Sequence, residues 1–387
     1  MSLLLAFELL VAAALVGVLT QTVLNLVAMP RLGRLAPPAP LGAPLVSVLI
    51  PARNEERTIA RCLRAWARQE YADYEVLVFD DDSTDRTAER AVAAAAGLRR
   101  GRVLRGRGLP EGWRGKPYAC HRLAREARGD ILVFVDADLL PTPAALGSTV
   151  SALRALAADA LSAVPRHVGR HPAVSALVAL QNWASLAFVP AWRQRRAPGR
   201  VVVAMNGQFV AIRRDVYEGA GGFAAVRSAL GEDVAFGRRL ARLGYRVRLL
   251  DGSAVLTCEP YATLGEAWTA NARNLLPVFF GSVPILVLAL GLLGAVYLGP
   301  AGLLLVGALS GRAADPRWGW LPLAELALAL GARWIADRRV GYPSWLALTH
   351  PLAVAAAIGI GVSSVIGFRW RREIEWRGRR YSVTDAA

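Results

Sequence analysis

Short, continuously apolar runs alternate with segments of helical periodicity through the middle of the chain. The runs LVSVLIPA, EVLVFD and DILVFVDADLLP, at residues 45–52, 75–80 and 130–141, predict strands buried on both faces of a parallel sheet. After the first two runs, EERTIARCLRAWARQ and STDRTAERAVAAAA have the apolar spacing of helices. Strands that alternate with helices predict an α/β domain with a doubly wound sheet, which we place at residues 45–270.

An apolar segment precedes this domain. Residues 1–29 are long enough to cross a bilayer as a helix, and Glu8 is their one charged side chain. The segment lacks the basic start of a signal peptide, and Arg31 and Arg34 follow it directly. We therefore expect an uncleaved transmembrane anchor whose amino terminus lies outside, with the following domain in the cytosol.

A second apolar zone, residues 275–368, is expected to contain further transmembrane helices. It consists of apolar runs at residues 275–311, 318–336 and 344–368, and a basic tail at residues 369–387 follows it. If the tail and the domain are both cytosolic, the number of crossings between them is even. Four crossings meet this condition when the first run folds as a tight helical hairpin, and three crossings are the alternative. Either count predicts a multi-pass protein of the cell membrane.

Residues 172–192 are apolar enough to suggest another membrane span, but they lie inside the α/β domain. A crossing there would separate the strands of one sheet, so we expect interfacial helices over residues 172–196 instead. In that arrangement Trp183 and Trp192 lie at the depth of the lipid headgroups, and the arginines of WRQRR contact anionic lipid. The alternative is a helix buried in the core of the domain.

The composition agrees with a chain that lies partly in a membrane. Of the 387 residues 54% are hydrophobic, mean hydropathy is +0.34, and the net charge is +16. The basic residues lack the pattern of a recognition helix or a zinc finger, which argues against nucleic acid as a partner and favours an anionic membrane surface. The three cysteines lie far apart, so they indicate neither disulfides nor a zinc site and fit a reducing cytosol.

Acidic and polar residues cluster where the predicted strands end, and this is the edge at which α/β sheets bind ligands. PARNEE ends the first strand. Asp80, Asp81 and Asp82 end the second strand, and Ser83 or Thr84 is expected to cap the next helix. One acid would be enough for an ordinary turn, so three of them predict a functional site.

The third strand ends in Asp136-Ala-Asp138. Two carboxylates one residue apart at the end of a buried strand supply oxygen ligands for a hard divalent cation that also holds substrate phosphates. Upstream, GWRGKPYAC contains Lys116, the one lysine among 46 basic residues. A compact ammonium group suits a phosphate that is gripped and then released, so Lys116, in this glycine-rich loop, is expected to bind a diphosphate. A lysine left by chance in an arginine-rich chain is the alternative.

The motifs of the α/β domain follow a specific order. PARNEE, DDDSTD, GWRGKPYACHRLA, DILVFVDADLLP, GQFVAIRRDVYEGAGGF and GEDVAFGRRLARLGYRV occur in this order within residues 45–270. In this order they resemble the motifs of membrane-bound family 2 glycosyltransferases with a GT-A fold. GWRGKPYAC and the tail segment WRGRRY are most similar to the bacterial subset that glycosylates carotenoids or other polyisoprenoid and hopanoid-type lipids. Ceramide glucosyltransferases are a more distant relation.

The resemblance implies roles for residues of a nucleotide-sugar donor site. Asp81 would lie beside the uridine and Asp136 closer to the ribose and sugar, while Asp138 would hold a divalent cation, Mn or Mg, on the donor diphosphate. The family usually has glycine where this chain has Asp82, so this turn departs from the family pattern. Together with Lys116, the expected donor-binding positions are Pro51, Asn54, Glu55, Asp80, Asp81 and Asp136.

The resemblance also places the catalytic base. Asp233, in GEDVAF, corresponds to the general base of the family, and Glu232 beside it is the second expected catalytic residue. The start of a helix favours the charged form of Asp233. Displacement of a nucleoside diphosphate from an anomeric carbon needs a proton taken from an acceptor hydroxyl on the opposite face. One base without a second nucleophile favours a single displacement with inversion.

The region after the base restricts the expected activity. The Q-x-x-R-W motif of processive polysaccharide synthases does not occur in the sequence, so one sugar per acceptor is expected. The corresponding region, AWTANARNLLP, predicts an amphipathic helix approaching the membrane. On this helix Trp268 and Arg273 would contact the acceptor or the donor, and an ordinary interfacial helix is the alternative.

The expected function is transfer of a single hexose from a nucleotide sugar, UDP-glucose, to a hydroxyl of a membrane lipid such as a carotenoid or another polyisoprenoid. A nucleotidyltransferase acting on a sugar or lipid is one alternative, but such enzymes typically begin with a glycine-rich, basic loop, and PARNEE is acidic and free of glycine. A non-catalytic, nucleotide-binding membrane scaffold is the other alternative, and it would have no use for the base Asp233.

Overall fold

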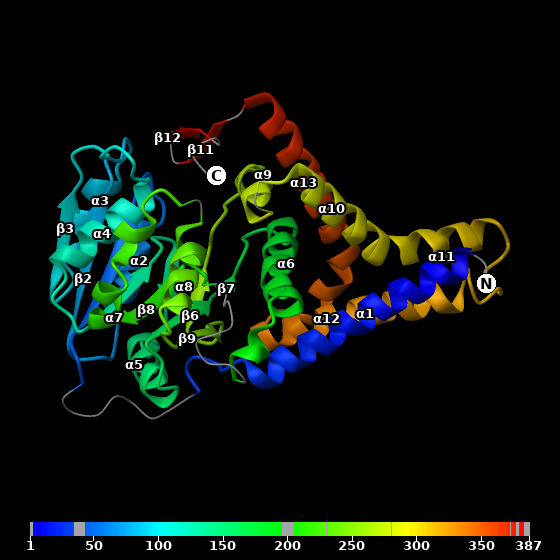
Figure 1. The fold of residues 1–387 in the computed structure, drawn as a ribbon, viewed down its shortest axis with the longest axis horizontal. Helices are drawn as coiled ribbons and strands as arrows, with labels where there is room; N and C mark the ends of the chain where they lie inside the picture. Colours follow the sequence, from blue (N-terminus) through cyan, green and yellow to red (C-terminus); the bar gives the residue numbers. More distant parts are fainter. Residues whose placement is uncertain are drawn as a thin grey trace. The chain divides into compact units, whose positions relative to one another are not determined.

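The chain forms two compact units in the computed structural model, which describes residues 3–34, 43–195, 205–229, 231–279, 281–371, 373–376 and 379–382. The helical unit contains Met1–Ala28, His167–Trp192 and Pro260–Ile374. The sheet unit contains Met29–Arg166, Arg193–Glu259 and Glu375–Ala387 (Figure 1).

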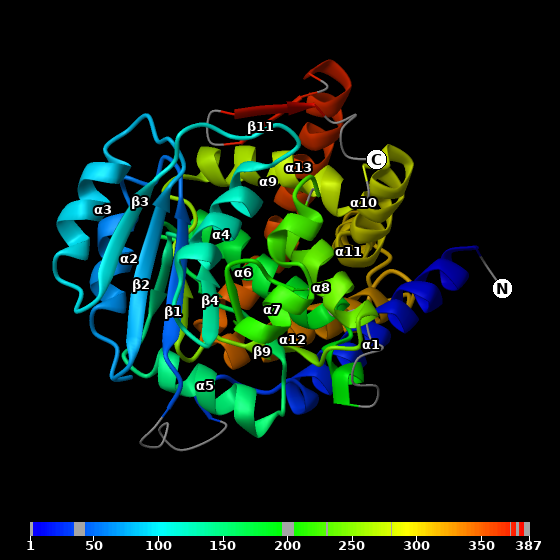
Figure 2. The ribbon, with the colours of Figure 1, turned by 60° about the vertical axis from the view of Figure 1, so that its left-hand side comes forward.

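The sheet unit is built on a mixed sheet of seven strands. These are β1 (Val46–Ala52), β2 (Tyr74–Asp80), β3 (Gly101–Arg105), β4 (Ile131–Val135), β6 (Ala160–Val164), β8 (Phe209–Arg213) and β9 (Val247–Asp251). Their order is β3-β2-β1-β4-β8-β6-β9, and the strands from β3 to β4 are parallel (Figure 2). β8 runs antiparallel to β4 and to β6, so the sheet is not parallel throughout.

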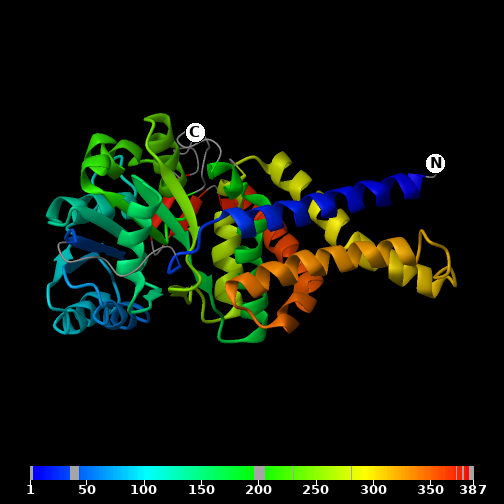
Figure 3. The same ribbon diagram turned by 90° about the horizontal axis from the view of Figure 1, so that it is seen from below.

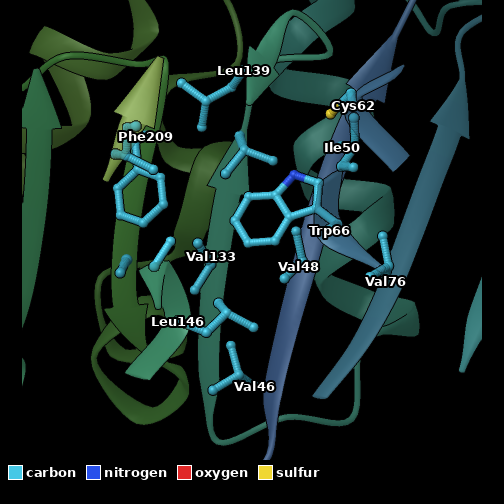
Figure 4. Packing of buried hydrophobic residues seen from close by; sticks show 14 of the residues in the cluster. Val46, Val48, Ile50, Cys62, Trp66, Val76, Val133, Leu139, Leu146 and Phe209 are labelled. Atoms are coloured by element: carbon cyan, nitrogen blue, oxygen red, sulfur yellow. The ribbon is translucent and has the colours of Figure 1, made fainter. Parts of the chain in front are cut away.

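Helices cover both faces of this sheet. One face is covered by α2 (Ile59–Trp66), α3 (Thr87–Ala95) and α5 (Ala145–Ala155), and the other by α4 (Gly115–Glu126), α7 (Arg214–Gly219) and α8 (Glu232–Arg242). Side chains alternate along a strand, so Val48 and Ile50 of β1 pack with Trp66 of α2 (Figure 4), whereas Leu49 packs on the opposite face. Burial on both faces explains why LVSVLIPA is almost continuously apolar.

Smaller elements complete the sheet unit. β5 (Leu139–Pro141) pairs antiparallel with β10 (Leu256–Cys258), and β7 (Arg166–His167) lies on the other side of β10. This pairing places Cys258 opposite Leu139, just beyond the end of β4. Two 3-10 helices, η1 (Ala191–Arg195) and η2 (Gly222–Val226), and a two-stranded sheet of β11 (Glu373–Trp376) and β12 (Arg379–Ser382) are the other elements.

The helical unit contains α1 (Leu3–Ala28), α6 (Pro172–Phe188), α9 (Leu264–Val278), α10 (Val283–Tyr297), α11 (Gly299–Leu309), α12 (Trp320–Val340), η3 (Ser344–Thr349) and α13 (His350–Arg371). α1 packs along α12 (Figure 3). Asn25 of α1 donates its amide hydrogens to the backbone oxygens of Leu186 and Val189, both at 2.7 Å, so that α1 is also joined to the end of α6.

Two helices of the described chain, α1 and Ser344–Gly367, are long and apolar enough to cross a membrane. α10 and α11 meet at a bend of 47°, and the pair counts as a third span if it is taken as one helix. The tight hairpin predicted for residues 275–311 is wrong, because Pro300 in the first turn of α11 permits a bend in the chain without reversing it. The number of crossings and the side of the membrane on which each unit lies stay predictions.

The segment 172–196 differs from the predicted pair of interfacial helices. It forms one α-helix, α6, followed by the 3-10 helix η1. Trp183 is 2% exposed, and its ring packs edge-on against those of Tyr297 and His350, with centroid distances of 5.4 Å and 4.7 Å. Trp183 therefore packs against other helices of its unit, and its depth relative to a membrane stays a prediction. A helix without a charged side chain gains most by burial among other helices, and α6 is buried in the helical unit.

An ion pair is buried within the helical unit. Arg333 and Asp337 of α12 are 0% and 1% exposed, and Arg333 Nε donates to both carboxylate oxygens of Asp337 at 2.8 Å. Nη1 of the same arginine lies 3.3 Å from His350 Nδ1. These polar groups interrupt the apolar surface of α12, which explains why α12 is not among the candidate spans although it has 21 residues.

Candidate active site

The ends of three neighbouring strands bring the predicted donor residues to one edge of the sheet. The register pairs Pro51 with Phe79 and Ala52 with Asp80, and Leu49 of β1 lies beside Phe134 of β4. PARNEE at the end of β1, the three aspartates at the end of β2 and the Asp136-Ala-Asp138 segment after β4 therefore leave the sheet side by side. Pro51 is the second-to-last residue of β1 and is partly buried at this edge.

Asn54 joins the loops that follow β1 and β2. Its backbone is in the left-handed region, with φ of 53°, where asparagine is tolerated better than most residues. Its side-chain oxygen accepts a hydrogen bond from the Thr84 N–H at 2.9 Å, and its own N–H donates to Ser83 Oγ at 3.0 Å. Ser83 and Thr84 thus form hydrogen bonds with Asn54. The prediction that one of them caps α3 is wrong.

The start of α3 is instead held by Asp85. Its Oδ1 accepts the Thr87 N–H at 2.9 Å, and its Oδ2 accepts the Glu56 N–H at 3.2 Å. Burial would raise the pKa of Asp85, but these hydrogen bonds outweigh burial and lower it. Glu55 contributes to the same junction, because its N–H donates to Thr87 Oγ1 at 2.7 Å and its Oε2 accepts from Thr58 Oγ1 at 2.8 Å.

Asp80, the last residue of β2, and Asp81 after it are buried, whereas Asp82 is exposed. Asp80 and Asp81 are 5% and 2% exposed. The Asp81 N–H donates to the Ala52 carbonyl at 2.8 Å, and its carboxylate is paired with the guanidinium of Arg379. Burial raises the pKa of Asp81 above its usual value, although the hydrogen bonds and charge of Arg379 and the charge of Arg53 oppose the shift.

Asp82 takes the backbone conformation that explains the glycine of the family pattern. Its φ is 60°, in the left-handed region where glycine carries no steric cost and aspartate carries a small one. Asp82 therefore takes a conformation that suits glycine, and it differs from glycine in this turn by its added carboxylate.

The two carboxylates after β4 have different partners. Asp136 Oδ1 lies 2.6 Å from Lys116 Nζ. Asp138 is hydrogen-bonded to the thiol of Cys258, which also accepts a hydrogen bond from Gln208 Nε2 at 3.2 Å. Burial and the carboxylates of Asp138 and Asp136 hold the pKa of Cys258 well above its usual range, so the thiol stays protonated and can donate to a carboxylate.

The donor set at Asp138 fits a divalent cation that takes most of its ligands from substrate. The described residues contain no group of three or more His, Cys, Asp and Glu side chains that could hold a metal ion by themselves. Mg²⁺ and similar cations typically bind one or two carboxylates and complete their coordination with substrate phosphates and water. Asp138 would hold such a cation, whose positive charge would offset the charge of a leaving diphosphate.

Lys116 lies at the centre of the site and connects three elements. It is the second residue of α4 and lies in the first helical turn. The prediction that Lys116 lies in a loop is therefore wrong. Its Nζ lies 2.6 Å from Asp136 Oδ1, 3.7 Å from Glu232 Oε1 and 3.3 Å from the Gly207 carbonyl oxygen. Burial opposes the charge of Lys116, but the carboxylates of Asp136 and Glu232 outweigh it and hold its pKa well above the usual value.

The geometry around Lys116 explains the use of a lysine. An ammonium group has three N–H donors that diverge from one nitrogen, and the three oxygens around Lys116 Nζ belong to separate parts of the chain. Glu232 Oε1, at 3.7 Å, contributes by its charge and not by a hydrogen bond. A guanidinium group is planar and has its donors fixed in a fork, which suits such separate directions less well. Binding of a diphosphate by Lys116 stays a prediction.

The two predicted catalytic residues begin α8. Asp233 Oδ2 accepts the Gly207 N–H at 2.8 Å, and Oδ1 accepts the Val234 N–H at 2.8 Å. Glu232 points to Lys116 instead. Burial raises the pKa of Glu232, while the charge of Lys116 opposes this shift and the charge of Asp233 adds to it. Asp233 is thus held by two backbone N–H groups and Glu232 lies beside Lys116, and the catalytic role of each stays a prediction.

The predicted acceptor residues lie in the helical unit. Trp268 and Arg273 are half-buried on α9, and Trp268 Nε1 donates to Ser363 Oγ of α13 at 3.1 Å. Trp268 packs with Leu177 and Ile360 in an apolar cluster that joins three helices. These contacts give Trp268 a structural role, and contact of Trp183, Trp268 or Arg273 with an acceptor stays a prediction.

A cavity of about 580 Å³ in the sheet unit lies at the opposite edge of the sheet. Its lining includes Pro44 and Asp130, which precede β1 and β4, together with Arg213 and Arg246. None of the predicted site residues lines it. In open α/β sheets ligands bind at the carboxyl ends of the strands, so this cavity is not the expected donor site.

Two residues of the site were not identified from the sequence. Gly207 binds both Lys116 and Asp233, and a Cβ at this position would lie 2.9 Å from Asp233 Oδ2. Its position at the start of GQFVAIRRDVYEGAGGF was the available signal. Arg379 is part of WRGRRY, a segment that carries the family resemblance, and it was not among the expected site residues. No local pattern connects it to Asp81, which lies 298 residues earlier.

Comparison with known proteins agrees with these motifs. The chain is 26% identical over 357 residues, 88% of each chain, to the 4,4'-diaponeurosporenoate glycosyltransferase of Staphylococcus aureus (strain USA300). The protein of the same name from Staphylococcus haemolyticus (strain JCSC1435) is 42% identical over 94 residues, which is 24% of either chain. The Probable glycosyltransferase YdaM of Bacillus subtilis (strain 168) is 29% identical over 58% of this chain and 52% of its own length.

A solved structure and a family model complete the comparison. Mannosyltransferase PcManGT from Pyrobaculum calidifontis, solved in complex with GDP-Man and Mn²⁺, matches 96% of this chain and 100% of its own with a TM-score of 0.54 and 21% identity. This likeness confirms the predicted α/β fold class, GT-A. The family described as Glycosyltransferase like family 2 matches residues 43–275. The chain therefore belongs to glycosyltransferase family 2, and it is a GT-A glycosyltransferase.

Proposed function

We propose that this enzyme transfers a single hexose, with UDP-glucose as the expected donor, to a hydroxyl group of a membrane lipid such as a carotenoid or another polyisoprenoid. The observation that carries the proposal is the position of Lys116 between Asp136, on the expected donor side, and Glu232, next to the base Asp233. The relative from Staphylococcus aureus, named for a carotenoid substrate and matched over 88% of both chains, supports the acceptor class.

The residues of the site divide the reaction between them. The acceptor oxygen forms a bond to the anomeric carbon of the hexose while the bond from that carbon to the diphosphate oxygen breaks, and the nucleoside diphosphate leaves with the electron pair. Asp233 takes the acceptor's proton, and its two backbone hydrogen bonds keep its carboxylate in position. Attack opposite to the leaving group inverts the anomeric centre.

The donor side needs positive charge, because the leaving diphosphate gains negative charge as the bond breaks. Lys116 is partly buried beside Asp136 and remains charged, since the neighbouring carboxylates hold its pKa well above the usual value in spite of burial. Its position in the first turn of α4 adds the positive end of a helix. A divalent cation held by Asp138 would supply further charge at the diphosphate, and Mn²⁺ accompanies GDP-Man in the structure of PcManGT.

The remaining parts of the proposal concern the membrane. We propose that the domain at residues 45–270 lies on the cytosolic side, with 1–29 as an anchor, further transmembrane helices within 275–368 and a cytosolic tail at 369–387. The two apolar helices α1 and Ser344–Gly367 support membrane association. The nucleotidyltransferase and scaffold alternatives are not retained, because the family match covers residues 43–275 and the relatives it resembles are named as glycosyltransferases.

The test is release of nucleoside diphosphate by the purified, detergent-solubilised chain. UDP-hexoses and GDP-mannose are offered with and without Mn²⁺ and with a lipid extract, and products are identified by mass spectrometry. We expect lipid-dependent release with a UDP-hexose that needs the cation and is lost in Asp233→Asn. Asp215→Asn is the matched control, because Asp215 pairs on the surface with Arg213 and its side chain is 63% exposed. Transfer by Asp233→Asn at the rate of the wild type would contradict the assigned base.

A further inference from the structure

The C-terminal strand β12 brings a buried arginine to the donor side of the site. Arg379 Nη2 lies 3.1 Å from Asp81 Oδ1, and Nη1 contacts Asp81 Oδ2. The two side chains are 15% and 3% exposed, so this ion pair is shielded from water on most sides. Two parallel N–H···O contacts of a guanidinium with a carboxylate fix the plane of both groups.

A second arginine lies near Asp81. Arg53 donates through Nη1 to the backbone oxygens of Asp81 and Asp82, the latter at 2.7 Å, and its charge also lowers the pKa of the Asp81 carboxylate. Asp82 adds a negative charge next in the chain. A buried carboxylate without a basic partner becomes protonated, because burial penalises the charged form.

Asp81 has a part in the proposed function that requires its charged form. It is the residue expected beside the nucleotide base, and only an ionised carboxylate accepts hydrogen bonds with both oxygens. Uracil and guanine each present a ring N–H that such a carboxylate can accept. The pair with Arg379 uses one lone pair on each oxygen, and each oxygen has a second lone pair for a ligand.

We propose that Arg379 is a positioning residue of the donor site, which holds Asp81 as an oriented carboxylate that accepts an N–H from the nucleotide base. The inference rests on the proposed use of a nucleotide sugar. The strand β12 would then take part in nucleotide binding, which is a different role from the contact with lipid that a basic tail suggests. Arg379 acts through Asp81 and does not contact the reacting atoms.

The experiment measures the affinity of the full, detergent-solubilised chain for free UDP and GDP, without acceptor, by calorimetry. Arg379→Met keeps the length of the side chain and removes its charge, and we expect it to weaken binding of the preferred nucleotide by about 10- to 100-fold near neutral pH. Arg379→Lys keeps the charge but not the fork, so an intermediate loss is expected. Arg86→Met is the control, because it removes an equally bidentate but exposed pair with Glu89.

The pH dependence separates positioning from a general effect on the fold. Burial already raises the pKa of Asp81 and Asp82 adds to the shift, so loss of the Arg379 contacts raises this pKa further, with Arg53 still opposing it. In Arg379→Met, Asp81 is then increasingly protonated as the pH falls. The deficit in nucleotide affinity should be larger at about pH 6 than at about pH 8.5, whereas a merely destabilised variant would show no such trend.

A double-mutant cycle with Asp81→Asn completes the test. If Arg379 acts through Asp81, Arg379→Met in the Asp81→Asn background should cause little further loss. Additive losses would overturn the inference, and so would unchanged affinity in a folded Arg379→Met variant. Tighter nucleotide binding by Arg379→Met would also overturn it, since Arg379 would then compete with the nucleotide base for the Asp81 carboxylate. A wild-type chain that binds neither UDP nor GDP would contradict the proposed function itself, and the inference with it.

Discussion

Replacing Gly207 by alanine tests whether catalysis depends on the position at which the Asp233 carboxylate is held. A Cβ at residue 207 would lie 2.9 Å from Asp233 Oδ2 and 3.2 Å from its Cγ, whereas ordinary van der Waals contact begins at 3.4 Å. The carboxylate must therefore move by the difference between 3.4 Å and 2.9 Å, about 0.5 Å, and the hydrogen bond from the Gly207 N–H, now 2.8 Å, is distorted.

The size of the effect follows from this displacement. Catalytic groups need to be held within about 0.5 Å of their productive position, and a misplacement of about 1 Å costs on the order of 100-fold in rate. We expect kcat of Gly207→Ala to fall by about 10- to 100-fold, which corresponds to about 1.4–2.7 kcal/mol of activation free energy. KM for the nucleotide sugar should change little, because Asp233 is expected to act on the acceptor.

The assay is transfer of radiolabelled hexose to extracted lipid, with kcat and KM determined separately and thermal unfolding followed in parallel. Gly147→Ala is the matched control, since a Cβ at position 147 meets nothing within 4 Å in α5. This control should keep full activity and stabilise its helix by about 0.5–1 kcal/mol. A folded Gly207→Ala enzyme with the kcat of the wild type would refute the reasoning, because the base could then move without consequence.

Three further changes are expected to give distinct results. Asp138→Ala should abolish the dependence of UDP binding on Mn²⁺ in calorimetric titrations, and a variant that keeps this dependence would place the cation elsewhere. Lys116→Arg should lower kcat by about 10-fold or more, because a planar fork does not match the directions of the contacts that Lys116 makes with Asp136 and the Gly207 carbonyl, and a fully active variant in steady-state assays would leave lysine without a specific role. Arg333→Leu should destabilise the helical unit by about 3–5 kcal/mol in chemical unfolding, since it leaves the buried Asp337 charge without its partner, and Arg333→Leu combined with Asp337→Leu should recover most of this loss.

The fold was predictable where a strand is buried on both faces. The three apolar runs contain β1, β2 and β4, because two-sided burial leaves its mark on nearly every residue of a strand. The third run was expected as one strand, but β4 ends at Val135 and Leu139–Pro141 forms the separate strand β5, which pairs with β10. The antiparallel direction of β8 was not predicted. Strand direction depends on pairing with distant strands, and the sequence of β8 resembles that of a parallel strand. The missed bend between α10 and α11 has a similar cause, because Gly299 and Pro300 permit either a bend or a reversal.

The candidate site was predictable to the extent that its residues follow strands or begin helices. Asp81 and Asp136 directly follow β2 and β4, and Asp233 lies in the first turn of α8, so these elements fix their positions. The resemblance had named all three. Their partners were less accessible. Lys116 was expected in a loop, and its place in the first turn of α4, between carboxylates of two other segments, depends on packing that brings α4 and α8 together on one face of the sheet.

The basic residues show why composition alone assigns roles poorly. Most of the arginines were interpreted together, as a surface for anionic lipid, yet their surroundings differ greatly. Arg86 is 63% exposed beside Glu89, and removal of such a pair typically changes stability by no more than about 1 kcal/mol. Arg379 is 15% exposed beside a carboxylate that is itself buried, and its removal leaves a charge with no water to stabilise it. We therefore expect arginine to be dispensable at position 86 and necessary at position 379, because burial of the partner carboxylate decides how much the charge of the arginine contributes.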